Sequence, residues 1–166
     1  VQYDGGALND ILTALGVAPI DWLSDGNRAV IIMTLINSIQ YVGISMVIYL
    51  AGLQNISSQY YEAAAIDGVS GWQQFRYITV PLLIPAISSS VTLNLIGGLK
   101  LFDVIQALTK GGPGYASHSL STLVANQYFQ ATNAGYSATI GLFSFVLIMI
   151  LSNIVTTYFN KKEVYM

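Results

Sequence analysis

Amide and phenol side chains within otherwise apolar stretches are the groups of this sequence best suited to bind a ligand. They fall into two sets at helical spacing: Asn37, Gln40, Tyr41 and Ile44 in one stretch, and Asn94, Gly98 and Leu101 in another. Amides and the tyrosine hydroxyl can exchange hydrogen bonds with the hydroxyls of a solute, and the aromatic ring can stack on a sugar ring. The same groups also join neighbouring helices in membrane bundles. The residues alone leave both interpretations open.

Groups for catalysis or metal binding are scarce. His118 is the only histidine, it lies between two serines, and cysteine is absent. Disulfides, thiolate zinc sites and thiol chemistry are therefore excluded. The glycines and proline at 111–114 are not followed by the Gly-Lys-Ser/Thr of a phosphate-binding loop, so we expect no ATP site in this chain. We predict no catalytic residue, no metal site, no cofactor and no enzymatic activity.

Lys100 and Asp103 stand three residues apart near the end of the second apolar stretch. On a helix this spacing suits an ion pair between a snorkelling lysine and a helix-end aspartate. A substrate gate is the alternative interpretation of the pair.

The segment from Tyr61 to Pro85 has the features of a mechanical connector. Alanines at 63–65 give a helix face with little side-chain bulk, which another protein can approach closely, and Gly68 suits a turn between two short helices. Charge-assisted contacts are available from Glu62, Asp67 and Arg76. Because Pro81 joins this unit directly to the next apolar stretch, a push on the segment would tilt that stretch. A solvated loop with ordinary helix-forming alanines is the alternative, and composition alone favours it.

The elements that hold these residues belong to a membrane protein. Charged residues make up 8% of the 166 residues and apolar residues 54%, whereas soluble domains carry about 25% charged residues. No charged residue occurs between Arg28 and Glu62, between Arg76 and Lys100, or between Lys110 and Lys161. Each of these stretches is longer than the about 20 residues that cross a bilayer as a helix. The composition excludes a free-standing soluble enzyme, a disordered chain and a nucleic-acid-binding protein, which needs a basic surface.

We therefore predict an all-α membrane protein with three transmembrane helices, short coupling helices and amphipathic outer helices. Shorter helices are expected at 7–15, 58–66, 71–78 and 121–130. Gly16 and Gly68 are expected to end the first two, and a Ser70–Gln73 capping box to start the third, which Pro81 ends. In order, the predicted segments are an outer segment (1–28), a transmembrane helix (29–51), a cytoplasmic loop (52–81), a transmembrane helix (82–106), an outer loop (107–136), a transmembrane helix (137–160) and a cytoplasmic tail (161–166).

The basic residues set this orientation. With the 52–81 loop and the C-terminus inside, the cytoplasmic side holds Arg76, Lys161 and Lys162, and the outer side holds Arg28 and Lys110. An excess of Lys and Arg on the cytoplasmic side is the pattern expected of membrane proteins.

The segment around Glu62 resembles the EAA loop of permease subunits in bacterial ABC importers. That pattern runs Glu-Ala-Ala, three residues, Gly, and later Ile-x-Leu-Pro. Here Glu62-Ala63-Ala64, Gly68 and Ile78-Thr79-Val80-Pro81 match it, with Val80 in place of leucine. Asp67-Gly68 resembles the carbohydrate-uptake subclass, as do residues 50–56 and 108–114, although Ser57 stands where that subclass commonly has proline. The resemblance covers about residues 7–166 and implies the last three spans of a permease with about six.

The resemblance also implies roles and partners. Glu62, Ala63, Ala64, Asp67 and Gly68 would sit in a groove of a cytoplasmic ATP-binding cassette subunit, with Glu62 meeting a basic residue. ATP would be hydrolysed on that separate chain, and closure of the ATPase dimer would switch the membrane helices between inward- and outward-facing states. The other implied partners are a second permease subunit, paralogous or identical, and an extracytoplasmic solute-binding protein. The implied location is the bacterial cytoplasmic membrane, with no nucleic-acid partner.

The cargo that the resemblance implies is a sugar or oligosaccharide. Its path would include Asn37, Gln40, Tyr41, Asn94 and Gly98. One alternative is the same type of permease for glycerol phosphate or another polar solute, for which Lys100 is the only cation in reach of the path. The other is a membrane assembly subunit without a path, in which the amides only join helices.

Overall fold

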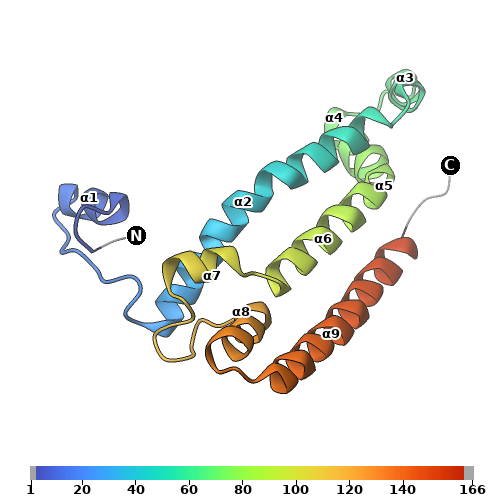
Figure 1. Ribbon diagram of the computed structural model, residues 1–166. Helices are drawn as coiled ribbons and strands as arrows, with labels where there is room; N and C mark the ends of the chain where they lie inside the picture. The colour runs from blue at the N-terminus through green and yellow to red at the C-terminus, as the bar shows by residue number, and fades with distance from the viewer. Residues whose placement is uncertain (1–2, 163–166) are drawn as a thin grey trace. The chain divides into compact units, whose positions relative to one another are not determined.

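The computed structural model describes residues 3–162, and within them all regular structure is helical (Figure 1). The elements are α1 (Ala7–Ala14), α2 (Gly26–Gln54), α3 (Ser58–Ile66), α4 (Gly71–Gln74), the π-helix η1 (Phe75–Thr79), α5 (Val80–Leu82), α6 (Ile84–Leu99), α7 (Asp103–Leu108), α8 (Leu120–Ala125), the π-helix η2 (Asn126–Gln130) and α9 (Ala134–Asn160). The last part of the predicted tail, 163–166, lies outside the described residues, as do residues 1–2.

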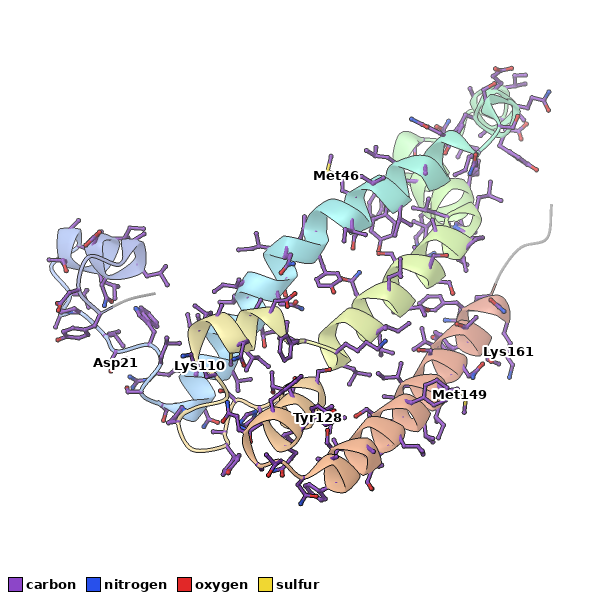
Figure 2. All side chains as sticks on the ribbon, viewed as in Figure 1. Asp21, Met46, Lys110, Tyr128, Met149 and Lys161 are labelled. Atoms are coloured by element: carbon purple, nitrogen blue, oxygen red, sulfur yellow. The ribbon has the colours of Figure 1, made fainter. Side chains whose placement is uncertain are left out.

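Three helical stretches are long and apolar enough to cross a membrane: Gly26–Gln54, Ile84–Leu108 and Ala134–Asn160. In their most apolar windows only 11%, 11% and 0% of the residues are buried within the chain. Met46 of α2 and Met149 of α9, for example, project outward from their helices (Figure 2). Helices that satisfy their own backbone groups and present apolar side chains outward are suited to lipid. The prediction of an all-α membrane protein with three spans is confirmed.

The chain forms two compact units, of which the first comprises Val1–Ile39 and Gly98–Phe145. Its core consists of Ala29 and Met33 from α2 with Val104 and Ile105 from α7. Asn9, 2% exposed, secures the N-terminal part of this unit. Its Oδ1 accepts hydrogen bonds from the Ile20 N–H (3.2 Å) and the Trp22 Nε1 (2.9 Å), and its Nδ2 donates to two backbone carbonyls.

The second unit comprises Gln40–Gly97 and Val146–Met166. Glycines let its helices approach closely, as small residues do in membrane bundles. A Cβ atom on Gly52 of α2 would come within 2.6 Å of the Ala86 Cβ of α6. A Cβ atom on Gly97 of α6 would come within 2.2 Å of the Tyr41 hydroxyl oxygen. Contact between α2 and α6 in this unit therefore depends on both glycines.

The predicted transmembrane helix over 82–106 corresponds to the candidate span Ile84–Leu108, but a single helix throughout it is wrong. α6 ends at Leu99, residues 100–102 are non-helical, and α7 begins at Asp103. Two glycines before the break lower helix propensity, and the Leu101 carbonyl accepts a hydrogen bond from the Ser119 hydroxyl. The predicted pair of Lys100 and Asp103 on one helix is therefore also wrong, since Lys100 lies in the turn and Asp103 starts the next helix.

Pro81 does not end the preceding helix, contrary to prediction. The chain passes from the π-helix η1 into α5, where Pro81 occupies the first turn. Proline is tolerated there because its missing N–H is not needed. In the wider π turn the Val80 N–H bonds to the Phe75 carbonyl, and the first residue outside helical structure is Leu83.

Candidate functional site

The turn between α3 and α4 is closed by backbone hydrogen bonds around Gly68. This glycine has a φ of 71°, a left-handed conformation that it adopts without a Cβ penalty. Its N–H donates to the Ala65 carbonyl (3.1 Å), and the Val69 N–H donates to the Ala64 carbonyl (3.0 Å). This pair of bonds is the Schellman motif of helix C-termini. The prediction that Gly68 ends the 58–66 helix is confirmed.

The predicted capping box at the start of α4 is also confirmed. The Ser70 N–H donates to Gln73 Oε1 (3.0 Å), and the Ser70 hydroxyl donates to the same atom (2.8 Å). The side chain thereby satisfies a backbone donor that the first turn leaves without a partner. Local hydrogen bonds therefore fix both sides of the turn.

The loop exposes its charged groups but not all of its alanines. Glu62, Asp67 and Arg76 are exposed. Ala64 is only 5% exposed, whereas Ala63 on the same helix is exposed. The predicted face of small side chains is thus partly internal: Ala64 packs within the unit, and Ala63 stays accessible beside Glu62.

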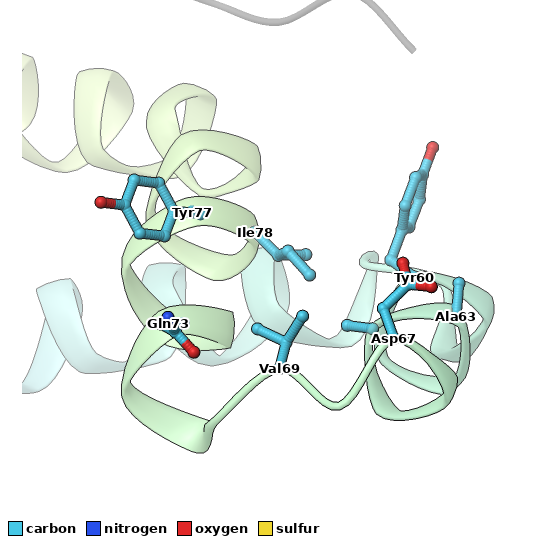
Figure 3. A pocket seen from close by; sticks show the side chains of 8 residues that line it. Tyr60, Ala63, Asp67, Val69, Gln73, Tyr77 and Ile78 are labelled. Atoms are coloured by element: carbon cyan, nitrogen blue, oxygen red, sulfur yellow. The ribbon is translucent and has the colours of Figure 1, made fainter.

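A cavity of about 420 Å³ lies between α3, the turn and η1 (Figure 3). It is lined by Tyr60, Ala63, Ala64, Asp67, Val69, Gln73, Tyr77 and Ile78. Asp67 contributes the one carboxylate and Gln73 the one amide of this set. The volume lies within the about 300–1,000 Å³ of ligand-sized pockets. The loop therefore offers a concave surface next to the exposed side chains of α3.

A side-chain hydrogen bond that the sequence did not predict joins α3 to η1. The Tyr61 hydroxyl lies 3.0 Å from the Thr79 hydroxyl, and Thr79 is 9% exposed. Thr79 occupies the variable position of the Ile-x-Leu-Pro pattern, where a polar residue among apolar neighbours was the available signal. α3 and η1 are thus connected twice, through the turn and through this bond.

Asn94 lies where it can join helices. Its Nδ2 donates to the Ser45 hydroxyl of α2 (2.9 Å) and to the Ser90 carbonyl of α6 (2.7 Å). Ser90 itself is only 1% exposed. The amide nitrogen of Asn94 therefore joins two helices, which is the interpretation of these amides that requires no solute.

The other residues of the predicted path belong to both units. Gln40 and Tyr41 fall in the second unit with Asn94, whereas Asn37 and Gly98 fall in the first. Within the described part of the chain, the buried Oδ1 atom of Asn37 has no hydrogen-bond partner. A Cβ atom on Gly98 would have nothing within 4 Å, whereas its neighbour Gly97 lies close to Tyr41. The assignment of these five residues to a path stays a prediction.

His118 is half-buried rather than on the open surface. Its Nδ1 lies 3.0 Å from the Thr122 hydroxyl. Its Nε2 occupies space that a Cβ atom on Gly111 would enter, at 2.1 Å. The missing side chain of Gly111 thus makes room for the imidazole. Over residues 3–162, no group of three or more His, Cys, Asp or Glu side chains is placed to hold a metal ion.

Known proteins with similar sequences form one family. The family described as binding-protein-dependent transport system inner membrane component matches residues 8–164. The trehalose/maltose transport system permease protein MalF of Thermococcus litoralis is 38% identical over 148 residues, which are 89% of this chain and 50% of that protein. The lactose transport system permease protein LacF of Rhizobium radiobacter is 36% identical over 152 residues, 89% of this chain and 51% of that protein. The chain thus spans about half the length of these relatives.

A solved structure shows the same fold. A crystal structure of a bacterial ABC transporter involved in the import of the acidic polysaccharide alginate has a TM-score of 0.78 and 23% identity. The match covers 95% of this chain and 56% of that one. Since the family match extends over almost the whole sequence and three helices can span a bilayer, the chain is a multi-pass membrane protein that belongs to the inner membrane components of binding-protein-dependent transport systems.

Proposed function

We infer that the chain is a permease subunit of an ATP-driven ABC importer that moves a sugar or oligosaccharide into the cell. It would lie in the bacterial cytoplasmic membrane with a second permease subunit and take its cargo from an extracytoplasmic solute-binding protein. ATP would be hydrolysed on separate ATP-binding cassette subunits. Family membership supports the dependence on a binding protein. Relatives named for the transport of trehalose and maltose, lactose, and arabinooligosaccharides support the class of cargo.

The fixed shape of the 62–81 loop is the observation that carries the ATPase coupling. Glu62 and Asp67 are exposed beside the 420 Å³ cavity, and Ile66 and Trp72 are 87% and 72% exposed. Large apolar side chains exposed next to charged ones are typical of protein-binding surfaces. The Schellman turn and the Tyr61–Thr79 bond hold α3 against η1, and η1 continues through α5 towards α6. A displacement of α3 by an ATPase would therefore move α6.

The cargo path would use the amides and the tyrosine of the spans. Asn37 presents a buried acceptor that has no partner among the described residues, and such a group is costly unless a ligand or another part of the assembly satisfies it. A hydroxyl of a sugar is a suitable donor. Movement of α6 would then expose the path alternately to the two sides of the membrane.

A matched pair of glycine variants tests the coupling in the complete transporter with its ATPase. Gly68→Ala forces a side chain into the left-handed conformation, at a cost of about 1–2 kcal/mol. We expect it to lower binding-protein-stimulated ATP hydrolysis and uptake several-fold. Gly71→Ala is the control, because Gly71 is exposed, has helical geometry, and would have nothing within 4 Å of an added Cβ.

A charge reversal tests the contact itself. Glu62→Lys removes a charge-assisted hydrogen bond and introduces repulsion, so we expect stimulated hydrolysis and uptake to fall at least about tenfold. The Ser58→Lys variant, at another exposed position of α3, should change both much less. Unchanged hydrolysis and uptake in both Glu62→Lys and Gly68→Ala would show that this loop does not couple the chain to an ATPase.

A further inference from the structure

A second pocket, of about 140 Å³, lies within the first unit, between α7 and η2. Phe102, Gln106 and Lys110 line it from the α7 side, and Asn126, Phe129 and Gln130 line it from η2. Its walls contain no Asp or Glu, and Lys110 supplies the ammonium group. None of these side chains belongs to the predicted cargo path or to the 62–81 loop.

The walls of this pocket are held by several hydrogen bonds. The Ser119 hydroxyl caps α8 by accepting from the Thr122 N–H (3.1 Å) and also donates to the Leu101 carbonyl before α7. His118 fills the space beside Gly111 and lies 3.0 Å from Thr122. The loop before α8 is thereby hydrogen-bonded to the segment that precedes α7, and His118 packs beside Gly111 after α7.

Two uncommon backbone features occur at the pocket. η2 is a π-helix, a rare form that is frequently found at functional sites. Lys110 has a φ of 51°, and non-glycine residues in this left-handed region cluster at ligand sites because the strain must be compensated. Lys110 and residues of η2 thus line the same pocket.

The lining selects one class of ligand. Phenylalanine rings can stack on the apolar face of a pyranose, and amides can exchange hydrogen bonds with its hydroxyls. The Asn126 Nδ2 donates to the Gln130 Oε1 (3.1 Å), which fixes these two amides relative to each other. A lysine with no acid beside it favours an anionic group. The volume is below the about 300 Å³ at which ligand-sized pockets begin, so it suits a single ring rather than a chain.

We propose that this pocket binds the carboxylate-bearing ring of an acidic sugar, with Lys110 contacting the carboxylate. The inference deepens the proposed function, on which it rests, by naming a cargo class and a contact site for it. In the predicted orientation this site lies on the outer side, where cargo would arrive.

Ligand-detected NMR on the complete transporter in lipid nanodiscs, without ATP, tests the proposal. Methyl β-glucuronide and methyl β-glucoside are the two probes, and saturation transfer reports their binding. We expect the glucuronide to bind, and Lys110→Asn to raise its Kd about tenfold, the loss of one hydrogen bond to a charged group. Asparagine tolerates the left-handed backbone, so this variant removes the charge without adding strain. Lys110→Arg should retain binding, and Lys100→Asn, at an exposed lysine outside the pocket, is the matched control.

Three results would overturn the proposal: no glucuronide binding by the wild type, equal loss of binding in Lys100→Asn, or equal binding of the two glycosides. The Gly68→Ala variant separates this test from that of the proposed function. Loss of coupling does not affect a measurement made without ATP, so glucuronide binding should be unchanged in Gly68→Ala. If Gly68→Ala transports normally while Lys110→Asn loses glucuronide binding, the proposed ATPase coupling is wrong and the proposed sugar-binding pocket is supported.

Discussion

Asn37 and Asn94 show how two similar side chains acquire different roles through their neighbours. A buried amide in a membrane helix needs a hydrogen-bond partner. Asn94 has partners in Ser45 and Ser90, whereas the Oδ1 of Asn37 has none among the described residues. Asn94 thus fastens α6 to α2, and a hydrogen bond from cargo to Asn37 stays a prediction.

Alanine variants separate these roles. Asn94→Ala should lower the free energy of unfolding by about 1 kcal/mol, the usual net contribution of one hydrogen bond, and leave the KM of uptake nearly unchanged. Asn37→Ala should raise KM with little loss of stability. Thermal unfolding in detergent and initial uptake rates measure the two effects. A higher KM in Asn94→Ala together with lower stability in Asn37→Ala would instead assign Asn94 to the cargo path and Asn37 to helix packing.

Gly97 and Gly98 provide a second contrast at single positions. Gly97→Ala places a Cβ atom 2.2 Å from the Tyr41 hydroxyl oxygen and 2.4 Å from the Tyr41 Cζ, so the ring must move. We expect a loss of about 1–3 kcal/mol, as in other overpacked sites. Gly98→Ala, where nothing lies within 4 Å, should be neutral. The Tm of each variant checks this, and in a Tyr41→Ala background the effect of Gly97→Ala should disappear.

The helical hairpin of α3 and η1 is the element on which the proposed coupling depends. Tyr61→Phe removes its bond to Thr79 and should weaken the contact by about 1 kcal/mol. Amide hydrogen exchange of α3 in the complete transporter should then be faster. Thr79→Val should have the same effect, and the double variant should add little to either. Tyr77→Phe, at a side chain that is 73% exposed, is the control, and faster exchange there would show that the assay detects something other than this bond.

Elements with local causes could be predicted from the sequence, and those with distant causes could not. The 58–66 helix has its cap, its alanines and Gly68 within a short segment, and its predicted bounds agree with α3. At the break over 100–102 the Leu101 carbonyl accepts a hydrogen bond from Ser119, a partner that no local sequence pattern indicates. No hydrophobic pattern in the sequence distinguishes the π-helices η1 and η2 from α-helices. The sequence therefore predicts helices in these segments but not the wider π turns.

The features of the loop and of the pockets could likewise be predicted only where their causes are local in the sequence. The turn at Gly68 and the Ser70 cap follow from residue types at fixed spacing. The Tyr61–Thr79 bond and the contact between Tyr41 and Gly97 depend on how helices pack. The pocket near Lys110 combines residues from a predicted helix end and from the outer loop, and no periodic pattern indicates that they meet.

At the scale of the molecule, lipid is the partner that the apolar surface requires. α9 has no buried residue in its most apolar window. An arginine at its centre, Phe145→Arg, should reduce membrane insertion, since a central charge costs about 2.5–3.5 kcal/mol in insertion assays. Thr157→Arg near the helix end should insert normally, because the long side chain reaches the interface. Glycosylation mapping of the chain ends gives the inserted fraction, and equal insertion of both variants would contradict the assignment of α9 as a span.

The π-helix η1 determines the azimuth at which the chain enters α6. Each residue of an α-helix advances the side-chain direction by about 100°. Converting Phe75–Thr79 from π-helical to α-helical geometry without removing a residue would therefore rotate every later position of α6 by about that angle relative to α3. Asn94 would turn away from Ser45, and Gly97 away from Tyr41. The π-helical geometry of η1 thus helps to specify which side of α6 meets α2.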